Sequence, residues 1–386
     1  MNEQITTLAS LTIDGKGSYG IGASAVPFSK DLYTYLRITD IKDDGTLNLQ
    51  DLKSVDDVKA SEYLLKPNDI VFARTGASTG RNYFYDGTDG EFVYAGFLIK
   101  FSIDEKKVNP KYIKYFCQSK QYKDWINSFN TGSTRGNINA QTLGKMPIPL
   151  IERKTQDALV SIISSIDEKI KKNNAINNNL EQQAQAIFKS WFVDFEPFSG
   201  VMPSEWSVST LGSVSIMGAG GDKPQNVSQT KTDLYQYPIY SNGLSNEGLY
   251  GFTDKAKIHE ESVTVSARGT IGFVCLRHIP FVPIVRLVTL VPKKEFISAK
   301  FLYLWLKQLH ITGTGTTQQQ LTVPDFQKAE ILIPSQEIVT LFTTTVEPIF
   351  EKIWANQSEN EKLSSLRDTL LPKLMSGELD VSNIEI

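Results

Sequence analysis

The sequence predicts a mixed α/β (α+β) fold in which one unit, a globular domain followed by a long α-helix, occurs twice. Three observations support this. The chain contains an internal repeat, two long segments share a 4-3 spacing of apolar residues, and short β-rich runs alternate with short helical segments between them. From the same pattern we expect the two long helices to pair as an antiparallel coiled coil with pseudo-twofold symmetry.

The long helices are predicted over residues 159–191 and 342–374, which match at a constant offset of 183 without a gap. Apolar residues and two asparagines repeat every 3.5 residues in both segments, and Arg367 is the one clear break. Such a seam needs a partner helix. A helix that only covers its own domain is the alternative, but the ungapped register favours pairing. The predicted seam residues are Ile163, Ile166, Ile170, Asn173, Asn177, Leu180, Val346, Ile349, Ile353, Asn356, Asn360 and Leu363.

An antiparallel pairing places the two asparagines of each helix near the middle of the seam, with Asn173 and Asn177 opposite Asn360 and Asn356. Buried asparagine pairs cost stability but penalise slipped registers, which suits a spacer of defined length. At ~1.5 Å per residue, the first seam would run for roughly 48 Å.

The repeat divides the chain into four parts. We expect globular domains at residues 1–150 and 198–333, and helical spacers at 151–197 and 334–386. Within the domains, residues 69–73, 92–101, 263–266 and 287–291 read as strands, and 110–127 and 299–309 as short helices.

Composition limits the classes of protein. Hydrophobic residues make up 40% of the chain and aromatic residues 10%, which is enough for real cores. The two cysteines lie far apart and the three histidines share no ligand spacing, so we expect neither a disulfide nor a metal site, and a reducing, cytoplasmic location. No segment reads as a signal peptide or membrane span, because the apolar stretch 279–291 is short and broken by Arg286.

The chain has a net charge of −3, and most of the acidic surplus lies in residues 334–386. The globular parts are close to neutral, which permits DNA binding without indicating it. The sequence contains no phosphate loop, dinucleotide-binding glycine motif or nucleophile elbow. Asn109-Pro110 is followed by lysine, so the motif that holds a flipped adenine is also missing. We therefore predict no catalytic residues in this chain.

Four glycine-containing loops carry donors that suit phosphates and base edges. Arg, Asn and Gln can contact guanine or adenine through two hydrogen bonds, and glycine lets the backbone approach a phosphate. Ordinary hairpin turns with polar tips are the alternative. Arg74 in ARTGASTG matches Arg268 in ARGTIG at an offset of 194. The candidate DNA-binding residues are Arg74, Thr75, Ser78, Arg81, Ser133, Thr134, Arg135, Asn137, Arg268, Thr270, Thr316, Thr317, Gln318 and Gln320.

Over nearly its whole length, the sequence resembles the specificity subunit of type I restriction–modification systems. The strings that carry the resemblance are GSYGIG (17–22), YLRITDI (35–41), LKPNDI (65–70) leading to ARTG (73–76), FKSWFVDFEP (188–197) and LLPKLMSGEL (370–379). The last two strings are the more specific. One departure is Trp206, which stands just ahead of the second domain and has no counterpart in the first.

The resemblance implies two target-recognition domains, each reading one half of a bipartite site on double-stranded DNA. The helices would set the gap between half-sites and dock two methyltransferase subunits, and restriction subunits would add ATP-dependent cleavage. Methylation at adenine N6 from S-adenosylmethionine would belong to the partner subunits, as would ATP and Mg, leaving this chain without a cofactor. A coiled-coil scaffold without DNA sequence specificity is the alternative from another class of protein.

Overall fold

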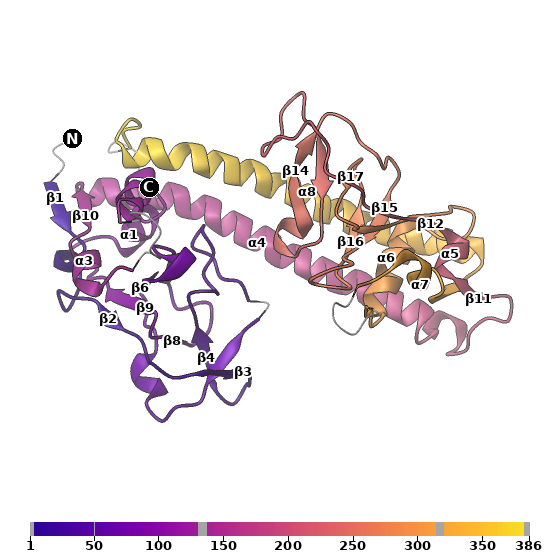
Figure 1. Ribbon diagram of the computed structural model, residues 1–386, viewed down its shortest axis with the longest axis horizontal. Helices are drawn as coiled ribbons and strands as arrows, with labels where there is room; N and C mark the ends of the chain where they lie inside the picture. The colour runs from indigo at the N-terminus through magenta and orange to yellow at the C-terminus, as the bar shows by residue number, and fades with distance from the viewer. Residues whose placement is uncertain (1–3, 50, 130–136, 314–319, 382–386) are drawn as a thin grey trace. The chain divides into compact units, whose positions relative to one another are not determined.

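A computed structural model describes residues 4–49, 51–129, 137–313 and 320–381 (Figure 1). Contacts between residues divide the chain into two compact units. Unit 1 comprises Met1–Lys172 with Glu359–Ile386, and unit 2 comprises Asn173–Ser358. Each unit therefore holds one globular domain and a stretch of each of two long helices.

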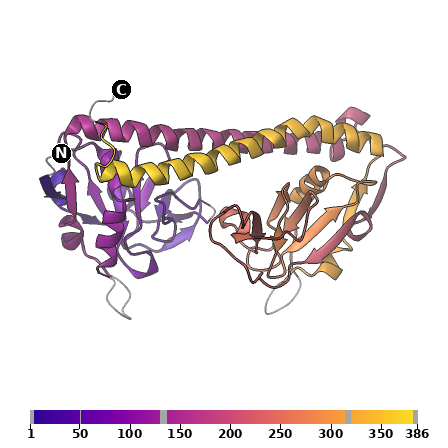
Figure 2. The same cartoon turned by 90° about the horizontal axis from the view of Figure 1, so that it is seen from above.

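The two long helices are α4, Arg153–Phe192, and α8, Gln336–Met375. In unit 1, Leu159 near the start of α4 shares a core with Leu371 near the end of α8. In unit 2, Phe188 near the end of α4 shares a core with Phe342 near the start of α8. Early residues of one helix thus pack with late residues of the other, which confirms the antiparallel pairing (Figures 1 and 2).

All twelve predicted seam residues are buried or half-buried. In unit 2, Asn356 donates from its Nδ2 to the Oδ1 of Asn177 at 2.8 Å, so the predicted polar layer forms between these two residues. The break at Arg367 has a physical reason, because its guanidinium pairs in unit 1 with Asp167 at 3.3 Å and with Asp368 at 3.0 Å.

The domain of unit 1 is built around a four-stranded sheet of order β2-β9-β6-β7. A second sheet has the order β3-β5-β4-β8, and β1 pairs with β10. The strands are β1 (Gln4–Thr7), β2 (Ser18–Tyr19), β3 (Ala25–Pro27), β4 (Tyr33–Leu36), β5 (Lys53–Val55), β6 (Asp69–Ala73), β7 (Asn82–Tyr85), β8 (Phe92–Tyr94), β9 (Leu98–Ser102) and β10 (Pro147–Leu150). The short helices are α1 (Pro110–Phe116), α2 (Lys120–Asn127) and α3 (Ala140–Gly144), with 3-10 turns η1 (Ala9–Leu11), η2 (Ala60–Tyr63) and η3 (Gly76–Ser78).

The domain of unit 2 repeats this plan. Its main sheet has the order β12-β18-β15-β16, a second sheet has the order β14-β13-β17, and β11 pairs with β19. The strands are β11 (Ser207–Thr210), β12 (Ser215–Ala219), β13 (Tyr237–Tyr240), β14 (Leu249–Thr253), β15 (Ser262–Val265), β16 (Val274–Arg277), β17 (Val282–Pro283), β18 (Val288–Pro292) and β19 (Glu330–Ile333). The short helices are α5 (Leu211–Val214), α6 (Ala299–Gln308) and α7 (Val323–Phe326), with 3-10 turns η4 (Glu196–Phe198) and η5 (Ser245–Gly248).

Two predicted elements of unit 1 are each divided in the structure. The predicted strand over 92–101 is β8 and β9, separated by a turn that the hydrogen bond from Leu98 N to Ala95 O closes at 2.8 Å. The predicted helix over 110–127 is α1 and α2, because the side chain of Ser119 accepts a hydrogen bond from Tyr122 N and caps a new helix.

Strand pairing and the hydrogen bonds after the central strands correct the alignment of the two domains. Ile70 of β6 pairs with Phe101 and Phe84, and Val263 of β15 pairs in the same way with Leu290 and Leu276. The hydrogen bonds after each strand fix the alignment along it, because Gly80 N donates to Ala73 O and Gly272 N donates to Ser266 O. Ala73 therefore matches Ser266, at an offset of 193 and not 194. Arg268 consequently corresponds to Thr75, and the predicted equivalence of Arg74 and Arg268 is wrong by one residue.

Trp206 has a role that only unit 2 requires. Trp206 is 4% exposed, and its ring packs against Phe192, the last residue of α4, and against Phe195 and Phe198 just after it. It therefore covers the aromatic residues through which the chain leaves the long helix. Among the described residues, no helix is long and apolar enough to cross a membrane.

Candidate nucleic-acid interface

One edge of the main sheet gathers the described parts of the candidate loops in each domain. In unit 2, Val265 at the end of β15 and Ala219 at the end of β12 both pair with Val288 at the start of β18. The segments beyond these ends are therefore neighbours. We call them the loop edge, which comprises 20–22, 74–81, 95–97 and 137 in unit 1, and 220–221, 268–272, 284–286 and 320 in unit 2.

Backbone hydrogen bonds lock each loop edge in the same way. In unit 1, Arg74 N donates to Phe97 O at 3.1 Å, and Ile138 N donates to Arg74 O at 2.9 Å. In unit 2, Leu321 N donates to Ala267 O at 3.0 Å. The arginine loops are therefore bonded to the residue that follows each of the second candidate loops, Ile138 in unit 1 and Leu321 in unit 2.

Glycine is required where the chain passes close to the backbone at the end of β8 in unit 1 and just after β17 in unit 2. A Cβ on Gly20 would lie 2.2 Å from Tyr94 O, and a Cβ on Gly220 would lie 2.7 Å from Ile284 O. No other residue permits this approach. The two glycines bring segments that are far apart in sequence to the same edge.

Arg74 projects from the loop edge of unit 1 against an aromatic ring. Its guanidinium carbon lies 5.1 Å from the centre of the Tyr19 ring, a cation–π contact. Its Nε is buried and has no hydrogen-bond partner among the described residues. The Tyr19 hydroxyl accepts a hydrogen bond from Ala140 N at 3.1 Å. Tyr19 thereby links the arginine to the segment that follows the second candidate loop.

The other described candidates of unit 1 differ in their surroundings. Thr75 is half-buried and forms a bridge with the exposed Asn137. Ser78 is half-buried, and its carbonyl accepts from Arg81 N at 2.9 Å, which closes the turn. The Arg81 side chain donates from Nε to Asp43 at 2.7 Å. Its Nη2 donates to the other carboxylate oxygen of Asp43 at 3.2 Å and its Nη1 to Ile41 O at 3.3 Å, so the guanidinium is held by three hydrogen bonds.

In unit 2 the structure brings two candidates from different loops together. The exposed Arg268 donates from Nε and Nη2 to the Oε1 of Gln320, at 3.2 and 2.9 Å. An arginine held in this way presents a fixed fork, the geometry that suits a guanine edge. Thr270 is exposed on the same loop. The remaining candidates, Ser133, Thr134, Arg135, Thr316, Thr317 and Gln318, lie outside the described residues.

Three residues at or directly beside the loop edges were missed by the sequence reasoning. Tyr19 contacts Arg74, Phe97 is 57% exposed beside it, and Arg286 is exposed at the equivalent position of unit 2. Only Arg286 gave a signal in the sequence, as a lone charge in an apolar stretch. The sheet register that places these residues at the edge is a tertiary feature, and no local pattern reports it.

Polar, charged and aromatic contacts hold each domain against the long helices. In unit 1, the Tyr115 hydroxyl donates to Asp167 of α4 at 2.9 Å. In unit 2, Lys300 Nζ lies 2.8 Å from Glu261 and 3.0 Å from Glu347 of α8, and the lysine side chain is 4% exposed. The His278 ring stacks on Trp354 of α8 at 4.1 Å. Burial, with the neighbouring charges of Lys300 and Arg277, lowers the pKa of His278 to about 4.

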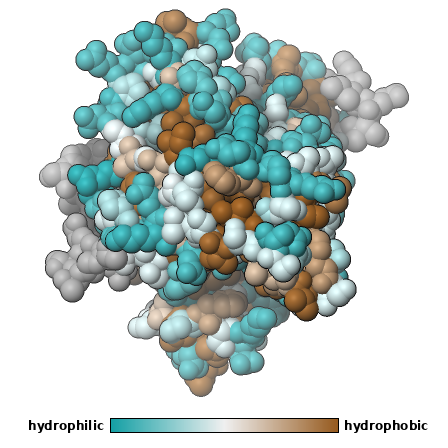
Figure 3. Space-filling model, turned by 90° about the vertical axis from the view of Figure 1, so that its right-hand side faces the viewer, coloured by the Kyte–Doolittle hydropathy of each residue, from teal (hydrophilic) through white to brown (hydrophobic). Residues whose placement is uncertain are grey.

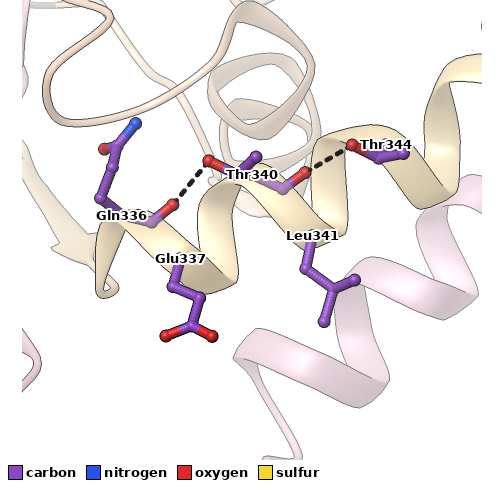
Figure 4. A pocket seen from close by; sticks show the side chains of 5 residues that line it. All are labelled: Gln336, Glu337, Thr340, Leu341 and Thr344. Atoms are coloured by element: carbon purple, nitrogen blue, oxygen red, sulfur yellow. Dashed lines mark hydrogen bonds between the residues drawn. The ribbon is translucent and has the colours of Figure 1, made fainter.

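The hollow in Figure 4, at the start of α8, is lined by Gln336, Glu337, Thr340, Leu341 and Thr344. The hydroxyls of Thr340 and Thr344 donate to helix carbonyls at 2.8 and 2.9 Å, so the hollow offers no free nucleophile from these residues. On the face shown in Figure 3, hydrophobic residues are interspersed among hydrophilic ones.

Cys117 and Cys275 are both buried, and burial raises the pKa of each thiol, to about 12 for Cys275. Neither is therefore an activated nucleophile. No group of three or more metal-ligating side chains occurs in the part of the chain that the structure describes.

Comparisons with known proteins agree with the two-domain architecture. Residues 30–182 and 203–363 each match the "Type I restriction modification DNA specificity domain". The HindI specificity subunit of Haemophilus influenzae is 26% identical over 404 residues, covering 82% of this chain and 87% of the relative. The MjaIX specificity subunit of Methanocaldococcus jannaschii is 27% identical over 314 residues, covering 73% and 72%.

A solved structure, the type I restriction–modification S subunit from M. genitalium, has a similar fold, with a TM-score of 0.57 and 18% identity. The alignment covers 97% of this chain and 96% of that one. The two matched segments together span most of the sequence. The chain therefore belongs to the type I restriction–modification DNA specificity family and carries two copies of its characteristic domain.

Proposed function

We propose that this chain is the DNA sequence-specificity subunit of a type I restriction–modification complex, in which each domain reads one half of a bipartite DNA site. One observation carries the proposal. The same loop edge is built twice in a chain of this family, with different side chains at equivalent positions: Thr75 against Arg268, and Phe97 against Arg286. A constant scaffold with variable contacts is what two different half-sites require.

The bases are read from the loop edges in this proposal. Arg268 with Gln320 supplies an oriented fork to a base edge in the half-site of unit 2, and Arg74 on Tyr19 does so in the half-site of unit 1. Both arginines can make the paired hydrogen bonds that distinguish guanine in the major groove. Exposed residues around them, such as Asn137, add contacts to bases or phosphates.

The catalytic chemistry belongs to partner subunits in this proposal. Two methyltransferase subunits would transfer the methyl group of S-adenosylmethionine to adenine N6, and restriction subunits would use ATP and Mg for cleavage. The helices α4 and α8 would dock these partners and set the spacing between half-sites. The names of the two relatives, both specificity subunits, support this division of labour.

A binding experiment separates this proposal from the coiled-coil scaffold. The chain, purified with its methyltransferase subunits, should bind the duplex that carries the sequence methylated in the source genome more tightly than a scrambled duplex, with a strong salt dependence. Equal binding to both duplexes would favour the scaffold. Deleting one heptad, residues 170–176, should alter or abolish recognition of the original spacing. Unchanged spacing would exclude the spacer role.

A further inference from the structure

We propose that Arg286 contacts the DNA backbone in the half-site read by unit 2, and that the side chain of Asn242 holds it beside Arg268. The inference rests on the proposed function and adds a contact and a positioning residue to it. The motifs that identify the family do not include either residue. Three observations carry it: the strained turn that holds Arg286, the Asn242 amide bonded to the backbone before both arginines, and the exposure of the Arg286 side chain.

Arg286 lies on a turn with an unfavourable backbone conformation. Val285 has φ 53° and Arg286 has φ 63°, both in the left-handed region that β-branched and bulky residues rarely adopt. The turn persists because the backbone N–H of each of these two residues is hydrogen-bonded. Val285 N donates to Gly221 O at 2.9 Å, and Arg286 N donates to Gly220 O at 2.8 Å. Strain that the surrounding structure maintains in this way is concentrated at functional sites.

The Asn242 amide joins this turn to the arginine loop. Its Nδ2 donates to Val285 O at 2.6 Å, and its Oδ1 accepts from Ala267 N at 2.7 Å. Val285 and Ala267 immediately precede Arg286 and Arg268. One side chain with both a donor and an acceptor therefore fixes the backbone before each arginine, and the two cations start from neighbouring points of the loop edge.

The two arginines differ in how their side chains are held. Arg268 is oriented by Gln320, whereas the exposed Arg286 has no side-chain hydrogen bond or ion pair among the described residues. A base edge requires a fixed fork, but a phosphate accepts a cation from many directions. This difference assigns base reading to Arg268 and backbone contact to Arg286.

Unit 1 has an uncharged residue at the equivalent position. Its turn presents Phe97, 57% exposed, whose carbonyl accepts the hydrogen bond from Arg74 N. Replacing Phe97 by alanine therefore removes an exposed group from the same place without changing the charge. Lys294 provides the second control, because it is an exposed cation beyond Pro292, at the opposite end of β18 from Arg286.

The test measures the full chain in complex with its methyltransferase subunits, on the methylated-sequence duplex and on a scrambled duplex, across a range of salt concentrations. R286A should weaken binding to both duplexes by a similar factor and reduce the slope of log K against log salt by about one. R286K should keep the slope. F97A and K294A should leave the slope unchanged. N242A should reproduce part of the loss seen with R286A, since the backbone before Arg286 is released.

Three results would overturn the inference. R286A could bind like the unaltered chain, R286A could lose affinity only for the methylated-sequence duplex with an unchanged salt slope, or K294A could reduce the slope as much as R286A does. Unchanged binding by N242A would exclude the positioning role of Asn242. Failure of the proposed function is recognised separately, because the unaltered complex would then bind both duplexes equally.

Discussion

Replacing Phe188 by alanine should destabilise unit 2 by about 4 kcal/mol. The side chain is fully buried, and its ring centre lies 5.2 Å from that of Phe192, 5.4 Å from Phe301 of α6 and 5.8 Å from Phe342 of α8. A buried Phe→Ala change costs about 3–5 kcal/mol, and each aromatic pair contributes roughly 0.5–1.5 kcal/mol beyond burial. Phe188 joins three helices in one core, so the upper half of that range applies.

Thermal unfolding of the full chain measures this loss. For a unit of this size, about 4 kcal/mol corresponds to a fall in Tm of roughly 8–16 °C. V193A is the matched control, because Val193 directly follows α4 and is 46% exposed. It should change stability by less than about 0.5 kcal/mol. A loss below about 1 kcal/mol for F188A would refute the reasoning that this ring anchors the domain of unit 2 to the long helices.

Three further predictions concern unit 2. R268A and Q320A should each cost about 1–3 kcal/mol of discrimination between the correct and an altered base in one half-site. The double variant should lose less than the sum of the two single losses, because the two side chains are bonded to each other. The measurement is methylation of duplexes with altered bases, and strictly additive losses would contradict the pairing. The pKa of His278 falls from 6.5 to about 4 on folding, so the stability it contributes should be complete above pH 6.5 and decline as pH falls toward 4. Unfolding of H278Q at several pH values should lack that part of the decline, and an unchanged pH profile would exclude His278 as its source. K300M should destabilise unit 2 by about 2–3 kcal/mol, which is less than for a fully buried ion pair because both carboxylates are partly exposed. Urea unfolding should detect this loss. Unaltered stability would show that the contacts of Lys300 are dispensable.

The long helices could be predicted from the sequence because their signal is local and repeated. The 4-3 spacing and the constant offset indicate two helices that form a common seam, and the structure contains α4 and α8 with 40 residues each. The antiparallel direction followed from the duplication and is confirmed by the cores of both units. The pairing of Asn177 with Asn356 is the most specific part of that prediction to be observed.

The loop edges were only partly predictable. Both arginine loops contain Ala-Arg, so the sequences align at an offset of 194, but the backbone hydrogen bonds that follow β6 and β15 set the offset at 193. Because strand side chains alternate between faces, a shift of one residue changes which side chain occupies each position. The contacts of Arg74 with Tyr19, and of Asn242 with Val285, join segments far apart in the chain. No spacing in the sequence reports them.

Exchange of residues 1–150 for the corresponding domain of another family member tests the central claim most directly. The methylated adenines of a host that carries the hybrid chain and its partner subunits would be located by single-molecule sequencing. We predict a bipartite motif in which one half changes and the other half stays as in the unaltered system. A motif that changes in both halves, or in neither, would contradict the account of two independent reading domains.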